Sequence, residues 1–124
     1  MIPGGPGTRK EVANTLLIDS IRAVCNSCRY IFTICTGSAL LAKTGLLDGQ
    51  DATSHHWFID HLQESYPKVH FVKDRRYVEH EKLATAAGLT SGIDMALRVV
   101  ERFYGRPVAV ATANYMEYHS KLWE

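Results

Sequence analysis

The stretch YIFTICTGSALL, residues 30–41, decides the fold of this chain. It opens with an apolar, β-branched and aromatic run that is typical of a buried strand, and this run ends at Cys35. A Thr-Gly-Ser turn follows, and then the good helix formers of residues 39–42. This order predicts a strand, a sharp turn and a helix. It is the layout of a nucleophile elbow, with cysteine in the place of the usual serine.

The predicted position suits the chemistry of a thiol. Cys35 would lie at the carboxyl edge of a sheet and at the amino end of a helix, where the dipole and free N–H groups favour the nucleophilic thiolate. Gly37 allows the tight turn and lets a substrate approach the backbone. The alternative is a buried core cysteine, because free cysteine is among the most buried residue types. The local sequence leaves both interpretations open.

Composition excludes several classes of protein. The chain has 124 residues, which suits one domain, and its 46% hydrophobic and 22% charged residues are ordinary for a soluble globular protein. A net charge of +1 gives no electrostatic case for a nucleic-acid or membrane partner. No apolar run approaches the ~20 residues of a membrane helix, and the start does not read as a signal peptide. Three cysteines without a secretion signal favour reduced thiols, so we expect a cytoplasmic protein.

The remaining elements follow from periodicity. Apolar spacing predicts a helix from about Lys10 to Val24, capped by Thr8, and the tail from Tyr118 is expected to be a loose end. The other predicted elements are strands at 52–54, 69–72, 76–79 and 82–86, and helices at 57–65, from Thr90 or Ser91 to Gly105, and from Pro107 on. The alternation of strands and helices predicts an α/β fold with a mainly parallel sheet.

Two patterns invite a metal or redox interpretation. The motif CNSC at 25–28 has no second copy to complete a zinc site, and it falls at a predicted helix C-terminus, where the dipole opposes a thiolate. The histidines at 55, 56, 61 and 70 do not have the spacing that would place them on one helix face. We therefore expect no metal and no cofactor, and we interpret residues 25–28 as a turn.

His55 differs from the other histidines in its placement. It ends a predicted strand that would neighbour the strand leading to Cys35 in a parallel sheet. The carboxyl ends of such strands meet at one crevice. We therefore expect Cys35 and His55 to face the same site.

Four blocks of sequence, at residues 2–7, 34–38, 52–55 and 87–94, together resemble the ThiJ/PfpI superfamily of class I glutamine-amidotransferase-like domains. The similarity is greatest to the branch that holds isonitrile hydratases and the ligand domains of AraC-type regulators. It implies a flavodoxin-like three-layer α/β/α sandwich. Because the family's glycine loop normally follows earlier strands, we expect residues 1–124 to be a single domain that lacks its first strands and helices.

The resemblance also implies the site residues. Cys35 is the expected nucleophile, and His55 would stabilise its thiolate or relay a proton. The backbone N–H groups of Gly5 and Thr36 would bind developing negative charge. Four neighbouring residues are expected to line the pocket: Gly4, Gly37, Gly88 and Leu89.

Together with the resemblance, these residues imply a cysteine-nucleophile hydratase or hydrolase that adds water to a small electrophile such as an isonitrile. Because members of the family are commonly dimers, we expect a homodimer. Thr36 stands where peptidase-like members carry histidine, which argues against peptidase activity. The acidic residue that usually hydrogen-bonds the family's nucleophile lies in a segment that the chain lacks. We expect either that a partner supplies this residue or that the thiol is poorly tuned and activity is low. The alternative function is a non-catalytic ligand-sensing or redox-sensing domain. Since no helix-turn-helix follows residue 118, we expect that this chain does not itself read DNA.

Overall fold

The structure, a computed structural model, describes residues 1–124. The chain forms two compact units, Met1–Gly92 and Ile93–Glu124. All of the predicted site residues lie in the first unit.

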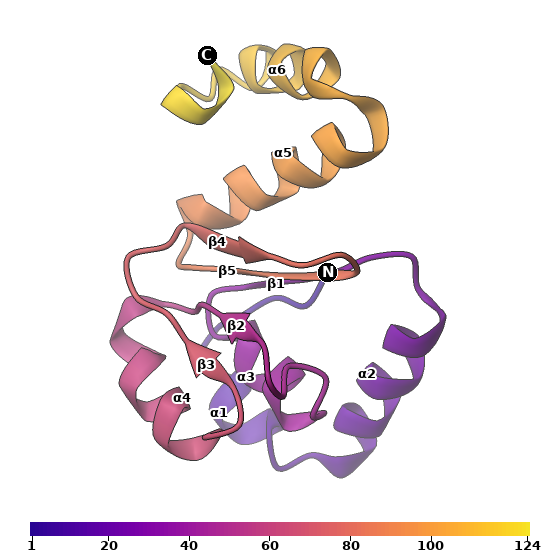
Figure 1. The fold of residues 1–124 in the computed structure, drawn as a ribbon, viewed down its shortest axis with the longest axis vertical. Helices are drawn as coiled ribbons and strands as arrows, with labels where there is room; N and C mark the ends of the chain where they lie inside the picture. Colours follow the sequence, from indigo (N-terminus) through magenta and orange to yellow (C-terminus); the bar gives the residue numbers. More distant parts are fainter. The chain divides into compact units, whose positions relative to one another are not determined.

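The first unit is built on a small mixed sheet (Figure 1). Its centre is the parallel pair β1 (Ile31–Ile34) and β5 (Leu83–Ala86), and β4 (Tyr77–Glu79) runs antiparallel to β5. On the other side of β1, Ile2 forms a parallel bridge with Thr33, and the Ile2 N–H donates to the Phe32 carbonyl at 2.8 Å. The glycine loop therefore leaves the sheet beside the strand that carries the elbow.

A second, two-stranded parallel sheet pairs β2 (Asp51–Ala52) with β3 (His70–Phe71). The chain after β2 is tied to β5, because the Thr53 N–H donates to the Thr85 hydroxyl at 2.8 Å. This bond brings the segment that leads to His55 alongside the first sheet. The predicted α/β class is confirmed, whereas the three-layer sandwich stays a prediction.

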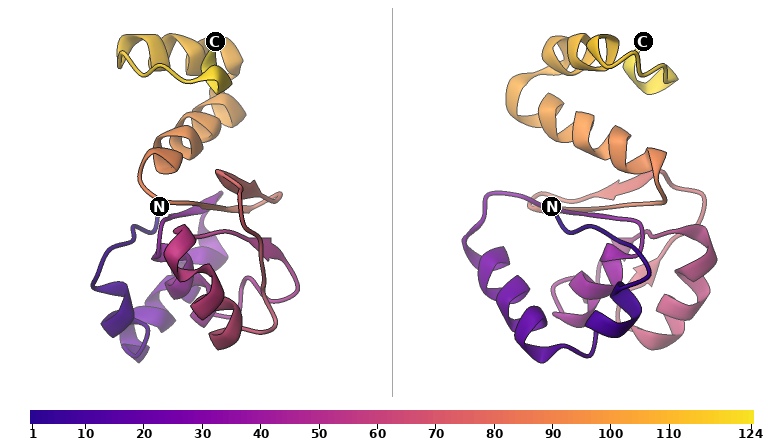
Figure 2. Two further views of the ribbon diagram at one scale, coloured as in Figure 1. Left: turned by 90° about the vertical axis from the view of Figure 1, so that its left-hand side faces the viewer. Right: turned by 180° about the vertical axis from the view of Figure 1, so that it is seen from behind.

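The helices of the first unit lie on the same side of its sheet in both orientations (Figures 1 and 2). They are α1 (Thr8–Glu11), α2 (Thr15–Ser27), α3 (Gly37–Lys43), the 3₁₀-helix η1 (His56–Phe58) and α4 (Ile59–Ser65). The apolar core beneath the sheet includes Leu41, Leu47 and Val69, which are almost fully buried. Burial of this core stabilises the elbow, since α3 supplies several of its residues.

The single helix predicted from Lys10 to Val24 is wrong. Two helices occupy this region, and α2 begins afresh after Asn14. The Asn14 side chain accepts a hydrogen bond from the Leu17 N–H at 3.2 Å, which is the preferred chemistry of a helix N-cap. The break leaves α1 as a short separate turn that follows the glycine loop.

The second unit contains most of α5 (Thr90–Tyr104), then α6 (Arg106–Tyr115) and the 3₁₀-helix η2 (Lys121–Trp123). The prediction of a loose tail is wrong. Trp123 is only 3% exposed, and its indole N–H donates to the buried carboxylate of Asp94 at 2.9 Å. The Tyr118 hydroxyl donates to the same carboxylate oxygen at 3.2 Å, so the tail provides hydrogen bonds to a buried carboxylate.

None of the helices in the chain combines the length and apolar character that crossing a bilayer requires.

Candidate functional site

Cys35 occupies a strained turn between β1 and α3. Its φ of 57° is in the left-handed region, which costs a residue with a β-carbon about 1–2 kcal/mol. The Cys35 N–H is shared between the carbonyls of Ala86 and Ala87, each at 3.1 Å. Its carbonyl accepts hydrogen bonds from the hydroxyls of Ser38 at 3.2 Å and Ser54 at 3.0 Å. The elbow is therefore fixed by β5, α3 and the segment before His55.

The glycine loop is fastened to this elbow through Thr36. The Gly5 N–H donates to the Thr36 hydroxyl oxygen at 2.9 Å, and the Gly5 carbonyl oxygen lies 3.2 Å from the same hydroxyl. The Thr8 hydroxyl also donates to the Gly5 carbonyl, at 2.9 Å. The N–H of Thr36 itself has no acceptor within the chain. In this arrangement an incoming anion would find the Thr36 N–H free and would compete with the Thr36 hydroxyl for the Gly5 N–H.

The imidazole of His55 is held at the start of η1. Its Nδ1 accepts a hydrogen bond from the Trp57 N–H at 3.3 Å, so the proton of the neutral ring is carried by Nε2. The ring stacks on His56 with centroids 4.5 Å apart. It also lies directly against the backbone of Gly88, where a β-carbon would come within 2.6 Å of His55 Cδ2. Only glycine leaves room for this ring.

An open hollow of about 220 Å³ brings the main predicted residues together. Cys35, His55, Gly5 and Thr36 all line it. Its remaining walls come from the glycine loop, α1 and η1, and are formed by Pro6, Arg9, Trp57 and Phe58. The four residues predicted as nucleophile, proton relay and anion-binding amides therefore share one hollow, while their roles stay predictions.

The other predicted pocket residues do not line this hollow. Gly4 and Gly37 lie behind it, where β-carbons would come within 2.7 Å of the Thr36 nitrogen and 2.5 Å of the Ile2 carbonyl oxygen. Gly88 supports the His55 ring as described above. Leu89 has a φ of 43° and its side chain is 79% exposed. These residues shape the turns around the site and do not form its surface.

Sequence reasoning missed Arg9. This residue lies on α1, and its guanidinium carbon is 4.5 Å from the centre of the Phe58 ring, a cation–π contact. It contributes the one permanent positive charge in the lining, and no carboxylate lines the hollow. Its position one residue after Thr8, beside the glycine loop, was the available signal. The aromatic partner that holds it lies on a distant segment and leaves no mark in the local sequence.

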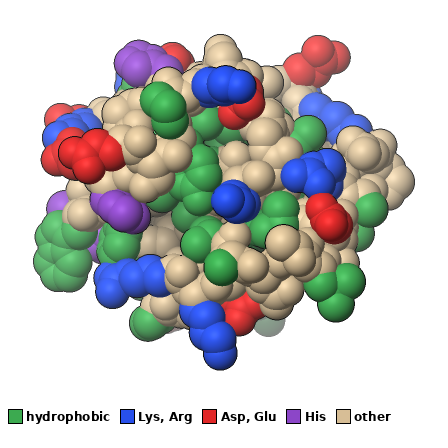
Figure 3. All heavy atoms as spheres, turned by 90° about the horizontal axis from the view of Figure 1, so that it is seen from below, with side chains coloured by type: hydrophobic (Ala, Val, Ile, Leu, Met, Phe, Trp, Pro, Cys, Tyr) green, Lys and Arg blue, Asp and Glu red, His purple; other side chains and the backbone are tan.

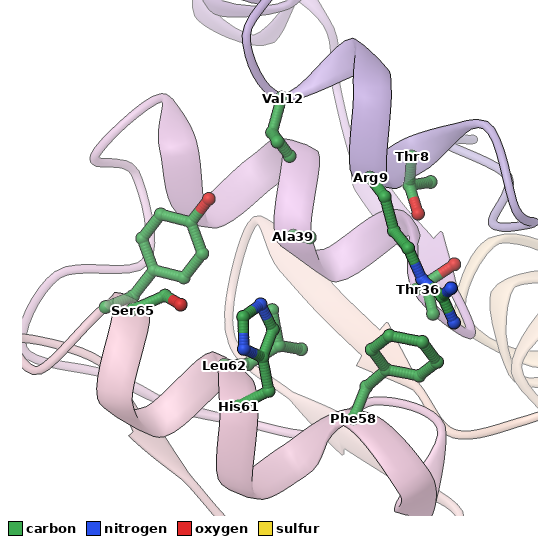
Figure 4. A pocket seen from close by; sticks show the side chains of 10 residues that line it. Thr8, Arg9, Val12, Thr36, Ala39, Phe58, His61, Leu62 and Ser65 are labelled. Atoms are coloured by element: carbon green, nitrogen blue, oxygen red, sulfur yellow. The ribbon is translucent and has the colours of Figure 1, made fainter.

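A second hollow, of about 240 Å³, lies between α1, α3 and α4. It shares Arg9, Thr36 and Phe58 with the first, so the two are adjacent. Figure 4 shows Arg9 pointing from α1 toward Phe58 and Thr36, with Leu62 approaching from α4. Figure 3 views the molecule from below Figure 1, and hydrophobic side chains are visible in a central hollow with basic side chains beside it.

The other thiols occupy different environments. Cys25 is buried in the core near the end of α2, and Cys28 caps that helix. The turn predicted at residues 25–28 is wrong, because α2 continues through Ser27 and keeps Cys25 on its core-facing side. Burial raises the pKa of the Cys25 thiol, with a smaller contribution from the nearby Cys28. Burial also raises the pKa of Tyr66, which lines the second hollow. Both groups therefore remain protonated at neutral pH.

Comparison with known proteins identifies relatives of this chain. The chain is 35% identical over 117 residues to the isonitrile hydratase of Pseudomonas putida, covering 94% of the chain and 50% of that protein. It is 30% identical over 118 residues to the HTH-type transcriptional regulator GbdR of Pseudomonas aeruginosa, covering 95% of the chain and 32% of the regulator. The fold is similar to that of a ThiJ/PfpI family protein from Pseudomonas syringae, with a TM-score of 0.83 and 27% identity over 95% of this chain and 48% of that one.

The chain thus spans about half the length of the hydratase, and less of the regulator. The model of the DJ-1/PfpI family matches residues 1–102, which include the elbow, the glycine loop and His55. The predicted resemblance is confirmed, and the chain belongs to the DJ-1/PfpI family.

Proposed function

We propose that the protein is a cysteine-nucleophile enzyme that adds water to a small electrophile such as an isonitrile. The observation that carries the proposal is the common hollow lined by Cys35, His55, Gly5 and Thr36. Similarity to an isonitrile hydratase supports the choice of substrate class.

In the proposed reaction, the Cys35 thiolate attacks the terminal carbon of the isonitrile and a C–S bond forms. His55 delivers a proton to that carbon, which gives a thioimidate. Water held by the Thr36 hydroxyl then adds to the same carbon while the nitrogen takes a proton. When this intermediate collapses, its hydroxyl proton passes to His55 and replaces the proton given in the first step. The C–S bond breaks, an N-substituted formamide is released and the thiolate is restored.

The amides of Thr36 and Gly5 would bind the negative charge that develops on oxygen during the second step. One such donor typically contributes about 3 kcal/mol to lowering the barrier. The Thr36 N–H is available without rearrangement. The Gly5 N–H becomes available when the Thr36 hydroxyl, now bonded to it, turns toward the attacking water.

The test is turnover of a small alkyl isonitrile by the wild-type protein and by Cys35→Ala. Formamide formation should disappear in Cys35→Ala and persist in Cys28→Ala, which removes a half-buried thiol remote from the hollow. A folded Cys35→Ala protein with wild-type turnover would rule out the assignment.

The second candidate is a non-catalytic sensor that binds a ligand in the same hollow. Two observations favour it: the similarity to the regulator GbdR, and the Gly5 N–H that is already bonded to Thr36. In its redox variant, Cys35 is oxidised to sulfenic or sulfinic acid. A ligand that binds equally well to the wild type and to Cys35→Ala, with no product formed from any electrophile, would favour the sensor over the enzyme.

The proposed assembly is a homodimer. Ile2 lies at the outer edge of the sheet of the first unit, next to β1, and exposed sheet edges favour association. Light scattering tests the proposal directly, and a monodisperse monomer at micromolar concentration would contradict it.

A further inference from the structure

Arg9 occupies the wall that the two hollows share. It lines both the space in front of Cys35 and the space between α1 and α4. Its guanidinium makes no ion pair or hydrogen bond within the chain, and its contact with the Phe58 ring is 4.5 Å. Stacking on an aromatic face restrains the guanidinium plane and leaves the N–H groups at its edge available.

We infer that the ligand of this site carries a carboxylate that pairs with Arg9 and an apolar group that occupies the hollow between α1 and α4. The inference rests on the proposed function, because it places the reacting atom of the same ligand at Cys35. It goes further by naming two features of the ligand, one charged and one apolar.

Charge complementarity supports the carboxylate. The planar guanidinium matches a carboxylate with paired hydrogen bonds, and no Asp or Glu lines either hollow to compete for it. A free arginine beside the glycine loop would therefore draw an anionic group toward the Thr36 N–H and Cys35. The neighbouring cation Lys10 lines neither hollow and provides a matched control.

The lining of the second hollow supports the apolar group. Val12, Ala39 and Leu62 contribute hydrocarbon to its walls. Tyr66 presents a phenol whose pKa is raised by burial, so this wall carries no negative charge at neutral pH. At about 240 Å³ the hollow accommodates a short alkyl chain.

The test compares two alkylating agents that differ only in charge, iodoacetate and iodoacetamide. In both reactions a C–S bond forms, the C–I bond breaks and iodide leaves with the electron pair. Because both reagents consume the same thiolate, the ratio of their rates cancels any change in thiol ionisation. Peptide mass spectrometry measures the ratio at Cys35, with Cys28 as the internal reference.

We expect the iodoacetate-to-iodoacetamide ratio at Cys35 to exceed that at Cys28 and to fall about threefold to fivefold in Arg9→Gln, as for a partly exposed ion pair. Lys10→Gln changes the net charge equally and should leave the ratio unchanged. The inference is overturned by an unchanged ratio in Arg9→Gln, or by an equal fall in Lys10→Gln.

A second measurement addresses the apolar group. Acetate, butyrate and hexanoate should protect Cys35 from iodoacetamide with increasing strength, roughly twofold or more per methylene for partial burial, and hexanamide should protect less than hexanoate. Equal protection by all of these compounds would overturn the inference. Neither measurement needs turnover. A protein that is inactive but retains the carboxylate preference would therefore contradict the proposed enzymatic function and leave the inference about the ligand standing.

Discussion

The hydroxyl oxygen of Thr36 lies 2.9 Å from the amide nitrogen of Gly5 and joins the elbow to a loop 31 residues earlier in the chain. Thr36→Val preserves the shape of the side chain but leaves the Gly5 N–H without its acceptor. We expect the free energy of unfolding to fall by about 1–3 kcal/mol, measured by urea denaturation. Hydrogen exchange at the Gly5 amide should become faster.

The matched control for this bond is Thr36→Ser, which keeps the hydroxyl and removes only a methyl group. It should retain slow exchange at Gly5 and most of the stability. If Thr36→Val and Thr36→Ser behave alike, the hydroxyl does not fasten the glycine loop.

Gly88→Ala should disturb His55 without straining the backbone of residue 88. The new β-carbon would lie 2.6 Å from His55 Cδ2, so the imidazole must move. If His55 relays a proton as proposed, displacement on this scale should reduce turnover by roughly tenfold to a hundredfold. We expect such a loss, together with a shifted His55 resonance in the NMR spectrum.

Gly7→Ala is the comparison for Gly88→Ala, since a β-carbon at Gly7 meets no atom within 4 Å. It should leave both turnover and the His55 resonance as in the wild type. An unshifted His55 resonance in Gly88→Ala would contradict the packing described above.

Ser38 and Ser54 both donate to the Cys35 carbonyl, and both are buried. Ser38→Ala and Ser54→Ala should each cost about 1 kcal/mol, because one donor remains in each single variant. In the double variant this carbonyl loses both side-chain donors. The loss in unfolding free energy should therefore exceed the sum of the single losses, as expected for residues that share a partner. Strict additivity in thermal or urea unfolding would show that the two hydroxyls act independently.

The buried thiol of Cys25 should make the free energy of unfolding depend on pH in the alkaline range. Burial raises its pKa above the ordinary value of 9.0 in the folded state. Above about that pH the unfolded chain releases the thiol proton while the folded chain retains it, so the unfolded state gains stability. The contribution of Cys25 is therefore fully present below pH 9 and is lost as pH rises through the folded-state pKa.

The check is urea unfolding between pH 8 and 10.5 with the wild type and Cys25→Ala. The alanine variant should be less stable at pH 8, because a buried atom is lost, and its stability should decline less steeply above pH 9. Parallel declines in the two proteins would remove Cys25 as a cause. In the folded wild type, iodoacetamide should also modify Cys25 more slowly than Cys28.

Much of the first unit could be predicted because its signals are local. The apolar run before Cys35 and the helix formers after it appear as β1 and α3. Cys35 and His55 line one hollow as expected, but the predicted pairing of their strands is wrong. The strand before His55, β2, pairs with β3 in a second sheet, and the hydrogen bond from Thr53 to Thr85 of β5 brings it alongside the first sheet. The roles of Cys35 and His55 stay predictions, since geometry alone does not measure reactivity.

The features that were missed depend on partners distant in sequence. The position of Arg9 is set by the ring of Phe58, and Trp123 is buried because its indole reaches Asp94. Neither contact is indicated in the sequence by an apolar periodicity or by turn-forming residues. The break before α2 had a local signal, Asn14, but the apolar spacing on both sides of it suggested one continuous helix.

The backbone of residue 35 holds a cysteine in a conformation that costs the fold stability. Glycine adopts a φ of 57° without steric cost. The free energy of unfolding of Cys35→Gly should therefore exceed that of Cys35→Ala by roughly 1 kcal/mol. Natural selection for a durable fold alone would favour glycine at this elbow. A cysteine at this position lowers the stability of the fold, so its retention is expected only where the sulfur atom has a function of its own.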